Sequence, residues 1–337
     1  MLTVAYVGFG NSVTNYHLPY VQTREFIKVK TIFRREEDRA DQAERERETL
    51  YPDITFTTDF NDVLNDPDID LIVVCAPNAM HVPYARDILE HGKNALIEKP
   101  LAASSSQARE LFALAKQKGL VLMTNQNRRY DMDFLALKDV VESGKCGKIV
   151  EVESHYDYFR PKIKDFVGYL WGLGVHTIDQ VISLFGIPEH VVYDVRSVYF
   201  PHSADDYFDL DFFYGDFKVV IKTCYAVKIK YPKFLLHGLN GSYIQYDAAT
   251  HNSDKKKISE PFEADFTPVP QEKWGTLTYM GENGAEVSEK VPMAFTDYAR
   301  LYDGLYDAIK NGGEKPVKDE ETIAVLEIIE QALKERK

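Results

Sequence analysis

Two glycines near the N-terminus have the spacing of a turn that binds phosphate groups. The apolar run 2–7 leads directly into Gly8-Phe9-Gly10-Asn11-Ser12-Val13. A dinucleotide site needs a tight turn at the first glycine and close approach of the backbone to the pyrophosphate at the second. The amides at the N-terminus of a following helix then face the phosphates. We therefore predict that Gly8 to Val13 bind the pyrophosphate of a dinucleotide.

The third small residue of this fingerprint is missing, because Val13 stands where glycine or alanine would let the helix pack closely on the strand. An unrelated glycine-rich turn is the alternative interpretation. The context favours the dinucleotide, since a strand precedes the turn and a helix follows it.

The residues after the second predicted strand bear on the choice of coenzyme. That strand, 29–33, is followed by Arg34 and Arg35. An NAD site usually has an acidic residue here for the ribose 2′-hydroxyl, whereas an NADP site has arginine. We predict NADP as the preferred coenzyme, with NAD as the other possibility. The two arginines could instead simply begin a solvated, charge-rich helix.

The first part of the chain alternates two patterns that would position these residues. Short β-rich runs lie at 2–7, 29–33, 71–75, 95–97 and 121–124, and helical segments lie at 35–50, 82–91 and 105–118. Such alternation predicts βαβ units and a parallel sheet. The run 71–75 is nearly continuous in apolar residues, as in a strand that is covered on both faces.

The pattern changes after about residue 148, where strands become alternating and linked by hairpins. The expected strands are 149–158, 207–214, 217–227, 234–239 and 242–246, with a further hairpin around Glu282-Asn283-Gly284. Helices are expected at 177–185, 296–310 and 319–336. Hairpin turns such as Asn240-Gly241 indicate an antiparallel sheet. We predict a Rossmann domain over 1–124 and an α+β domain for substrate binding and dimerisation over 125–337, whose closing helix could pack back on the first domain.

Length and composition narrow the class of protein. The chain has 337 residues, 45% of them hydrophobic, a formal net charge of −13 and three scattered cysteines. This length suggests about two domains, and the cysteines argue against a disulfide scaffold and a zinc site. An acidic chain disfavours nucleic acid as a partner. No apolar run reaches the roughly 18 residues of a membrane span, and no signal peptide is evident. We predict a soluble cytoplasmic protein with no metal, nucleic-acid or membrane partner.

Four further motifs follow the glycine turn in a fixed order. They are Ala76-Pro77-Asn78 with His81, then Glu98-Lys99-Pro100, then Asn127-Arg128-Arg129-Tyr130-Asp131, and then Gly174-Val175-His176-Thr177-Ile178-Asp179. With the degraded fingerprint, these motifs resemble the Gfo/Idh/MocA oxidoreductases, the family of glucose–fructose oxidoreductase and inositol dehydrogenase. The resemblance extends over essentially the whole chain.

The resemblance implies a fold, a reaction and an assembly. The fold is an N-terminal Rossmann domain with a doubly wound parallel sheet, followed by a C-terminal α+β domain with a large open antiparallel sheet. Family members bind NAD or NADP and move a hydride between C4 of the nicotinamide and a carbon that bears a hydroxyl or carbonyl. Their substrates are mostly sugars and cyclitols. The resemblance also implies a cis Lys99–Pro100 bond and a homodimer, or a dimer of dimers, through the second sheet.

The resemblance assigns the catalytic pair to Lys99 and His176. Removal of hydride from an alcohol requires a base that titrates near neutrality within hydrogen-bond reach of the hydroxyl, and histidine meets this need. A neighbouring ammonium favours neutral imidazole and stabilises negative charge that develops on oxygen. The remaining coenzyme contacts implied are Ala76, Pro77, Asn78 and His81 along the groove, and Glu98, Lys99, Asn127 and Arg128 near the nicotinamide.

One departure from the family pattern concerns the substrate site. The family commonly has aspartate four residues before the histidine, and Gly172 occupies that position here. Asp179 lies three residues after His176 and would share its helix face, so we include both among the predicted substrate contacts with Lys99.

The first strand of the second domain often offers polar side chains to the substrate in related enzymes. Alternation places His155 and Asp157 on one face and Tyr156 and Arg160 on the other. The sequence leaves open which face looks toward the nicotinamide. We select His155, Asp157 and Arg160 as candidate substrate contacts, with ordinary sheet and interface residues as the alternative.

Three hypotheses follow from these motifs. The first is an NAD(P)-dependent dehydrogenase or reductase acting on a CH–OH group of a sugar- or cyclitol-like substrate. The second is a non-catalytic NADP-binding sensor or regulatory protein, which Gly172 motivates. The third is a Rossmann reductase of another substrate class, such as amino acids or imines.

Overall fold

The computed structural model describes residues 1–159, 168–199, 203–229, 231–246 and 260–336. The chain forms two compact units. Unit 1 comprises Met1–Asn127, Asp297–Ile323 and the described residues of 251–265, and unit 2 comprises the described residues of Arg128–Thr250, Phe266–Thr296 and Ala324–Lys337. Residues 297–323, which the sequence places in the second domain, thus group with unit 1.

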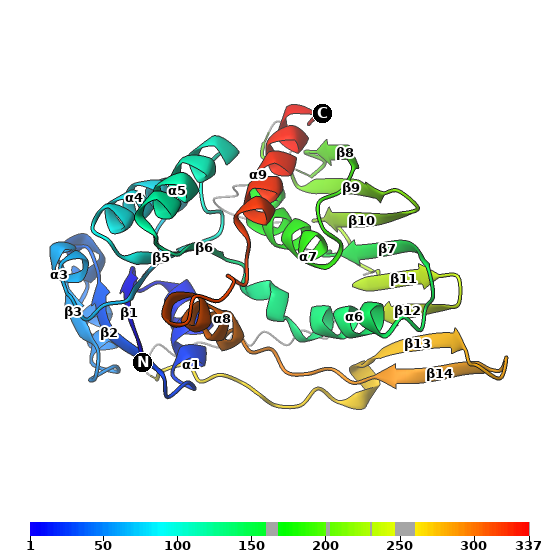
Figure 1. Cartoon of the computed structure of the whole chain (residues 1–337), viewed down its shortest axis with the longest axis horizontal. Helices are drawn as coiled ribbons and strands as arrows, with labels where there is room; N and C mark the ends of the chain where they lie inside the picture. Colours follow the sequence, from blue (N-terminus) through cyan, green and yellow to red (C-terminus); the bar gives the residue numbers. More distant parts are fainter. Residues whose placement is uncertain (160–167, 200–202, 230, 247–259, 337) are drawn as a thin grey trace. The chain divides into compact units, whose positions relative to one another are not determined.

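Unit 1 is built on a six-stranded parallel sheet (Figure 1). Its strands are β1 (Leu2–Val7), β2 (Ile27–Phe33), β3 (Thr55–Thr57), β4 (Leu71–Val74), β5 (Asn94–Glu98) and β6 (Leu122–Asn125). The order β3-β2-β1-β4-β5-β6 confirms the predicted doubly wound Rossmann sheet. The direction of winding changes between β1 and β4, and ligands bind at the carboxyl ends of strands flanking such a point.

Two of the helices predicted for unit 1, at 82–91 and 105–118, are present as α4 (His81–Glu90) and α5 (Ser105–Lys118). The other helical segments of this unit are η1 (Val13–His17), α1 (Leu18–Val21), η2 (Glu36–Arg39), α2 (Gln42–Glu48), α3 (Asn61–Leu64), η3 (Asn78–Met80) and α8 (Ala299–Lys310). Ser104 caps α5 by accepting from the Gln107 N–H, and Gly119 ends it in the left-handed region. The predicted helix over 35–50 is instead two segments, because Asp41 starts a new helix by capping the Ala43 N–H.

Unit 2 contains an eight-stranded sheet in the order β14-β13-β12-β11-β7-β10-β9-β8. The strands are β7 (Ile149–His155), β8 (His190–Arg196), β9 (Tyr207–Tyr214), β10 (Phe217–Cys224), β11 (Phe234–Gly238), β12 (Gly241–Gln245), β13 (Gly275–Met280) and β14 (Glu286–Val291). Neighbours are antiparallel, as predicted, except that β7 and β10 run parallel.

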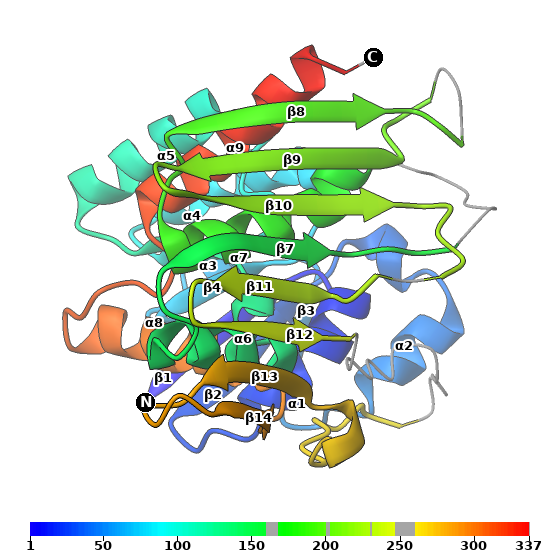
Figure 2. The same cartoon turned by 90° about the vertical axis from the view of Figure 1, so that its right-hand side faces the viewer.

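Helices cover one face of this sheet, and Figure 2 shows the other face toward the viewer with no described helix in front of it. The helical segments are α6 (Met132–Ser143), η5 (Leu170–Gly174), α7 (Val175–Phe185), η7 (Gln271–Lys273) and α9 (Asp319–Lys334). The first turn of α9 groups with unit 1. The short helix η4 (Asn127–Tyr130) spans the point in the sequence where unit 1 ends and unit 2 begins. The core joins Val152 of β7, and Tyr156 directly after it, to Ile178 of α7 and Ile329 of α9. The sheet therefore has one buried face and one open face.

Among the residues that the structure describes, no helix is long and apolar enough to cross a membrane.

Candidate coenzyme-binding and catalytic residues

The glycine turn after β1 has the backbone geometry that the sequence predicts. Gly8 has a φ of +99°, and its N–H donates to the Phe33 carbonyl at 2.9 Å. A Cβ at Gly8 would collide with the Cys75 carbonyl oxygen, so only glycine fits. A Cβ at Gly10 would meet no described atom within 4 Å. The backbone at Gly10 is thus open to close approach by a ligand.

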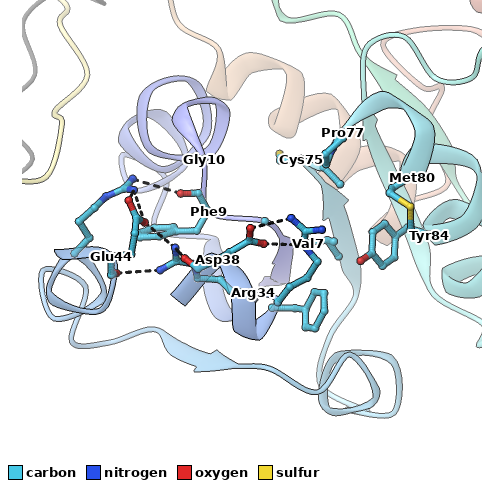
Figure 3. Close-up of a pocket in the computed structure, with 15 residues that line it drawn as sticks. Val7, Phe9, Gly10, Arg34, Asp38, Glu44, Cys75, Pro77, Met80 and Tyr84 are labelled. Atoms are coloured by element: carbon cyan, nitrogen blue, oxygen red, sulfur yellow. Dashed lines mark hydrogen bonds and ion pairs between the residues drawn. The ribbon is translucent and has the colours of Figure 1, made fainter. Parts of the chain in front are cut away.

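A pocket of about 400 Å³ lies beside this turn (Figure 3). The structure brings together seven of the predicted coenzyme contacts in its lining: Gly8, Phe9, Gly10, Arg34, Arg35, Ala76 and Pro77. The other lining residues are Val7, Phe33, Asp38, Glu44, Arg47, Cys75, Met80 and Tyr84. The pocket therefore sits at the carboxyl ends of β1, β2 and β4, with three arginines and two acids in its wall.

The Arg34 side chain is buried by the residues of η2 and α2 that follow it in the chain. The side chain is 4% exposed, and its terminal nitrogens donate to the carboxylates of Glu44 and Glu48 and to the carbonyls of Asp38 and Glu44, at 2.7–3.0 Å. These contacts tie η2 and α2 to the end of β2. Arg34 therefore lines the pocket with its terminal nitrogens already hydrogen-bonded.

Arg35 is the more accessible of the two predicted arginines, at 48% exposure. Its Nε and Nη2 each donate to an Asp38 carboxylate oxygen at 2.8 Å. Arg47, which the sequence analysis missed, donates to Glu44 and lies 5.1 Å from the centre of the Phe9 ring, as does Arg34. Two guanidinium groups thus lie within cation–π distance of the Phe9 ring.

The other predicted groove residues differ in exposure. Val13 is fully buried, whereas Asn11 and Asn78 are exposed. His81 is also fully buried, and its ring nitrogens lie 2.7 Å from the Pro100 carbonyl and 2.9 Å from the Ala76 carbonyl. His81 therefore links the segment after β4 to the segment after β5.

Glu98, at the end of β5, is the centre of a hydrogen-bonded cluster. Its Oε1 accepts from Ser12 Oγ at 2.6 Å and from Asn125 Nδ2 at 2.8 Å, and it lies 2.8 Å from His17 Nε2. Burial opposes ionisation of this carboxyl. The hydrogen bond and electrostatic interaction with His17, followed by the hydrogen bonds from Ser12 and Asn125, more than offset burial and lower the pKa to about 2. Glu98 is therefore a carboxylate at neutral pH.

Cys75 completes the cluster, with its Sγ 3.5 Å from His17 Nε2. Burial, followed by the charge of Glu98, raises the pKa of the Cys75 thiol well above its usual range, so the thiol stays protonated. A ligand atom from each of His17, Cys75 and Glu98 lies within 4.8 Å of the others. The 2.8 Å between His17 and Glu98 is a hydrogen-bond distance, whereas tetrahedral zinc would hold two ligand atoms about 3.3 Å apart.

Lys99 follows Glu98 and is partly exposed. Its backbone N–H donates to Glu98 Oε2 at 3.2 Å, and the Lys99–Pro100 bond is cis, which confirms that expectation. Asn127 begins η4, also with partial exposure. Lys99 therefore lies at the carboxyl edge of the sheet in unit 1.

The remaining predicted residues belong to unit 2. His176 is buried in the first turn of α7. Asp179 is also buried, and both its carboxylate oxygens accept from Arg129 at 2.7 Å. The Arg128 carbonyl accepts from Gln180 Nε2 at 2.7 Å. Arg128 and Arg129 are thus tied to α7, the helix that carries His176.

The structure answers which face of β7 each candidate occupies. Tyr156 donates to Gln180 of α7, so it lies on the helix-covered face. His155 and Asp157 lie on the open face, where His155 Nε2 is 2.7 Å from Glu153 and Asp157 accepts from the Cys224 N–H. They therefore lie on the opposite face of the sheet from α7. The candidate Arg160 lies outside the described residues.

Gly172 lies in η5, one turn before His176. Its N–H donates to the Gly168 carbonyl at 3.1 Å. A Cβ at this position would meet no described atom within 4 Å. The glycine is therefore not required by contact with the described part of the chain.

Some residues of the site were not predicted, because their contacts are with residues that lie far away in the sequence. In the sequence, Arg47 is one of many charged residues in a helical run. His17 and Tyr302 are 285 positions apart, yet His17 Nδ1 lies 2.6 Å from the Tyr302 hydroxyl. Asn125 carried a usable signal, because it ends a parallel strand, where site residues gather.

The parallel sheet, the positive-φ glycine and the adjoining pocket define a dinucleotide-binding Rossmann protein. Comparison with known proteins carries this further. Residues 2–126 match the family model described as oxidoreductase family, NAD-binding Rossmann fold, and residues 138–337 match the oxidoreductase family C-terminal alpha/beta domain. The chain therefore belongs to the Gfo/Idh/MocA oxidoreductase family.

Full-length relatives agree with this assignment. The oxidoreductase YhhX of Escherichia coli is 45% identical over 99% of this chain and 97% of its own length. The crystal structure of an oxidoreductase from Bacillus cereus superposes with a TM-score of 0.91 at 40% identity, covering 99% of this chain and 96% of the other. IolW of Bacillus subtilis, named scyllo-inositol 2-dehydrogenase (NADP(+)), is 27% identical over 100% of this chain and 94% of its own.

Proposed function

We propose that the protein is an NAD(P)-dependent dehydrogenase or reductase that acts on a CH–OH or carbonyl carbon of a sugar- or cyclitol-like substrate. The observation that carries the proposal is the pocket beside Gly8 and Gly10, at the carboxyl edge of the parallel sheet in a chain of this family. The name of the relative IolW supports the substrate class.

The residues present fit the coenzyme. The open backbone at Gly10 leaves room for a pyrophosphate, and Ala76 and Pro77 line the same pocket. When bound, NAD(P) supplies the nicotinamide carbon that accepts or gives the hydride.

His176 and Lys99 carry the acid–base chemistry in this proposal. His176 accepts the hydroxyl proton as the hydride leaves the substrate carbon, and it returns that proton in the reverse direction. The Lys99 ammonium stabilises the negative charge that develops on the substrate oxygen. The assignment of these roles rests on the resemblance of the Glu98-Lys99-Pro100 and His176 motifs to those of the family.

A coenzyme and substrate screen tests the proposal. Purified protein is mixed with NADP⁺ or NAD⁺ and a panel of cyclitols, polyols and aldoses, and with NADPH or NADH and the matching carbonyl compounds. Nicotinamide absorbance reports hydride transfer. We expect turnover with one polyhydroxylated substrate class. Absence of coenzyme binding would refute the proposal outright.

A non-catalytic NADP-binding sensor is the second candidate, and Gly172 favours it because the carboxylate common in the family is absent there. Saturable NADP⁺ binding without hydride transfer across the whole panel, with a specific protein partner, would favour this candidate. Any natural substrate with measurable turnover would exclude it.

We propose NADP as the preferred coenzyme, with Arg35 as the residue that selects it. Arg35→Ala should weaken NADP⁺ binding by about 1.5 kcal/mol, roughly tenfold, because one charge-assisted contact to the 2′-phosphate is lost. NAD⁺ binding should stay within twofold. Asp38→Asn removes one of the two carboxylates that pair with Arg35, the other being Glu37, and should strengthen NADP⁺ binding.

Arg34→Ala is the comparison variant for Arg35. It removes a buried guanidinium, while Glu44 keeps Arg47 and Glu48 keeps Arg39 as partners. We expect stability to fall by about 2 kcal/mol, with equal losses for the two coenzymes. Calorimetric titration with each coenzyme separates the cases, and an unselective effect of Arg35→Ala would contradict its assigned role.

We further propose that the open face of the second sheet mediates a homodimer or a dimer of dimers. Its centre carries rows of opposite charge, in which Lys218 contacts Glu151 and Asp211, and Lys222 contacts Asp209. Light scattering of the purified protein measures the oligomeric state.

A further inference from the structure

The Glu98 cluster extends into unit 1 through a chain of buried side chains. His17 Nδ1 lies 2.6 Å from the Tyr302 hydroxyl, which lies 3.0 Å from the Tyr6 hydroxyl. These three residues come from η1, α8 and β1 and are at most 2% exposed. A continuous line of hydrogen bonds therefore runs from Tyr6 to Glu98.

The protonation states of the two tyrosines and of Glu98 show which of these groups can donate a hydrogen bond and which can only accept one. Burial raises the pKa of both Tyr6 and Tyr302, so each hydroxyl keeps its proton and can donate. Glu98 is ionised, so its Oε1 accepts from His17 Nε2–H, and the Tyr302 hydroxyl lies within hydrogen-bond distance of both His17 Nδ1 and the Tyr6 hydroxyl.

The line does not reach water, because Tyr6 at its far end is fully buried. It therefore cannot supply or remove protons during turnover. Its effect is to hold the His17 ring in one orientation, as an outer hydrogen-bond partner does for a functional histidine.

Glu98 uses its two oxygens differently. Oε1 faces the three side chains of Ser12, His17 and Asn125. Among the described residues, Oε2 contacts only the Lys99 N–H, at 3.2 Å. One oxygen is thus fixed by the protein, and the other retains lone pairs at the sheet edge where the coenzyme is proposed to bind.

We propose that His17 is a positioning residue, which holds the Glu98 carboxylate so that Oε2 accepts a hydrogen bond from a donor at the nicotinamide–ribose end of the coenzyme. This inference rests on the proposed function and deepens it. The groups that face Glu98 are His17 and Ser12 at the first turn, Cys75 after β4 and Asn125 on β6, with Tyr302 of α8 behind His17. Cys75 stays neutral, and among the partners that lower the pKa of Glu98 His17 has the largest effect, ahead of Ser12 and Asn125.

A matched pair of substitutions separates positioning from packing. The amide nitrogen of His17→Gln can take the place of Nε2 and still donate to Glu98, whereas that of His17→Asn reaches only the Nδ1 position. Both variants are polar and uncharged, and the asparagine side chain is shorter than that of glutamine by one methylene group. Tyr302→Phe removes the hydroxyl behind His17, and Tyr306→Phe on the same helix is the control.

The readout is the dissociation constant of NADP⁺ between pH 5 and pH 8, divided by the wild-type value at each pH. This ratio removes the titration of the 2′-phosphate itself, whose pKa is about 6. In His17→Asn the pKa of Glu98 is no longer held low, because burial opposes its charge and a main donor is gone. The carboxyl then becomes protonated as the pH falls, and we expect binding about tenfold weaker at pH 5 and within twofold of wild type at pH 8.

The other variants complete the test. His17→Gln and Tyr306→Phe should match wild type at every pH, and Tyr302→Phe should give a smaller loss of the same pH form as His17→Asn. Glu98→Gln should be about tenfold weaker at every pH, and adding His17→Asn to it should introduce no pH dependence.

Several outcomes would overturn the inference. They are an equal loss at all pH values in His17→Asn, wild-type affinity in Glu98→Gln, or one equivalent of zinc that His17→Asn removes. Wild-type protein that binds neither coenzyme refutes the proposed function and this inference together, whereas wild-type binding with a flat His17→Asn ratio refutes this inference alone.

Discussion

Alanine in place of His176 should lower kcat/KM on the substrate found in the screen by about 10²–10⁴-fold, because the hydroxyl proton loses its acceptor. Lys99→Ala should lower it by about 10²–10³-fold through loss of charge stabilisation on the substrate oxygen. The two effects should not multiply in the double variant, since both residues are proposed to serve one proton and hydride transfer.

Controls keep this result specific. Lys116→Ala on α5 and His91→Ala after α4 remove the same side-chain types at exposed positions of unit 1, and both should keep wild-type turnover. His176→Ala should still bind NADP⁺, which separates lost chemistry from lost folding. Unchanged turnover in both His176→Ala and Lys99→Ala would remove the proposed catalytic pair.

The second large effect is expected at the glycine turn. Gly8→Ala should lower the free energy of unfolding by about 2–4 kcal/mol and abolish coenzyme binding, because its φ is positive and the new methyl group meets the Cys75 carbonyl. Gly10→Ala has no such conflict with the described residues. It should leave stability within about 0.5 kcal/mol and weaken NADP⁺ binding more than tenfold.

This contrast separates the structural glycine from the ligand-contacting one. Chemical denaturation measures the first effect, and titration with NADP⁺ measures the second. If Gly10→Ala bound the coenzyme as tightly as wild type, the pyrophosphate would have to lie elsewhere. If Gly8→Ala were as stable as wild type, the turn would not need its present backbone.

The parallel sheet of unit 1 was predictable because its strands are short apolar runs at regular spacing, and β1 begins and ends where the sequence places it. β3 was missed because only three residues pair. The parallel contact of β7 with β10 was also missed, since hairpin signals report only strands adjacent in the chain. The return of residues 297–323 to unit 1 depends on packing between segments far apart in sequence, which local patterns do not encode.

In the candidate site, too, some features were predictable from the sequence and others were not. Local turn chemistry made it possible to predict Gly8, Gly10 and the arginines after β2, because their type and position follow from it. Local patterns do not indicate which arginine is enclosed, because the partners Glu44 and Glu48 lie on the following helix, 10 and 14 residues after Arg34. Alternation along β7 correctly paired His155 with Asp157, but only the packing of α7 reveals which face they occupy.

Gly172 has a consequence for how this chain could change over time. A Cβ there meets no described atom within 4 Å, so side-chain collisions with the described residues do not keep an acid out of the position. Two of the four glycine codons become an aspartate codon by one base change, and the other two become a glutamate codon, so a carboxylate is one base change from any glycine codon. The position is thus open to natural variation, and Gly172→Asp offers a direct way to ask whether substrate range shifts when the acid returns.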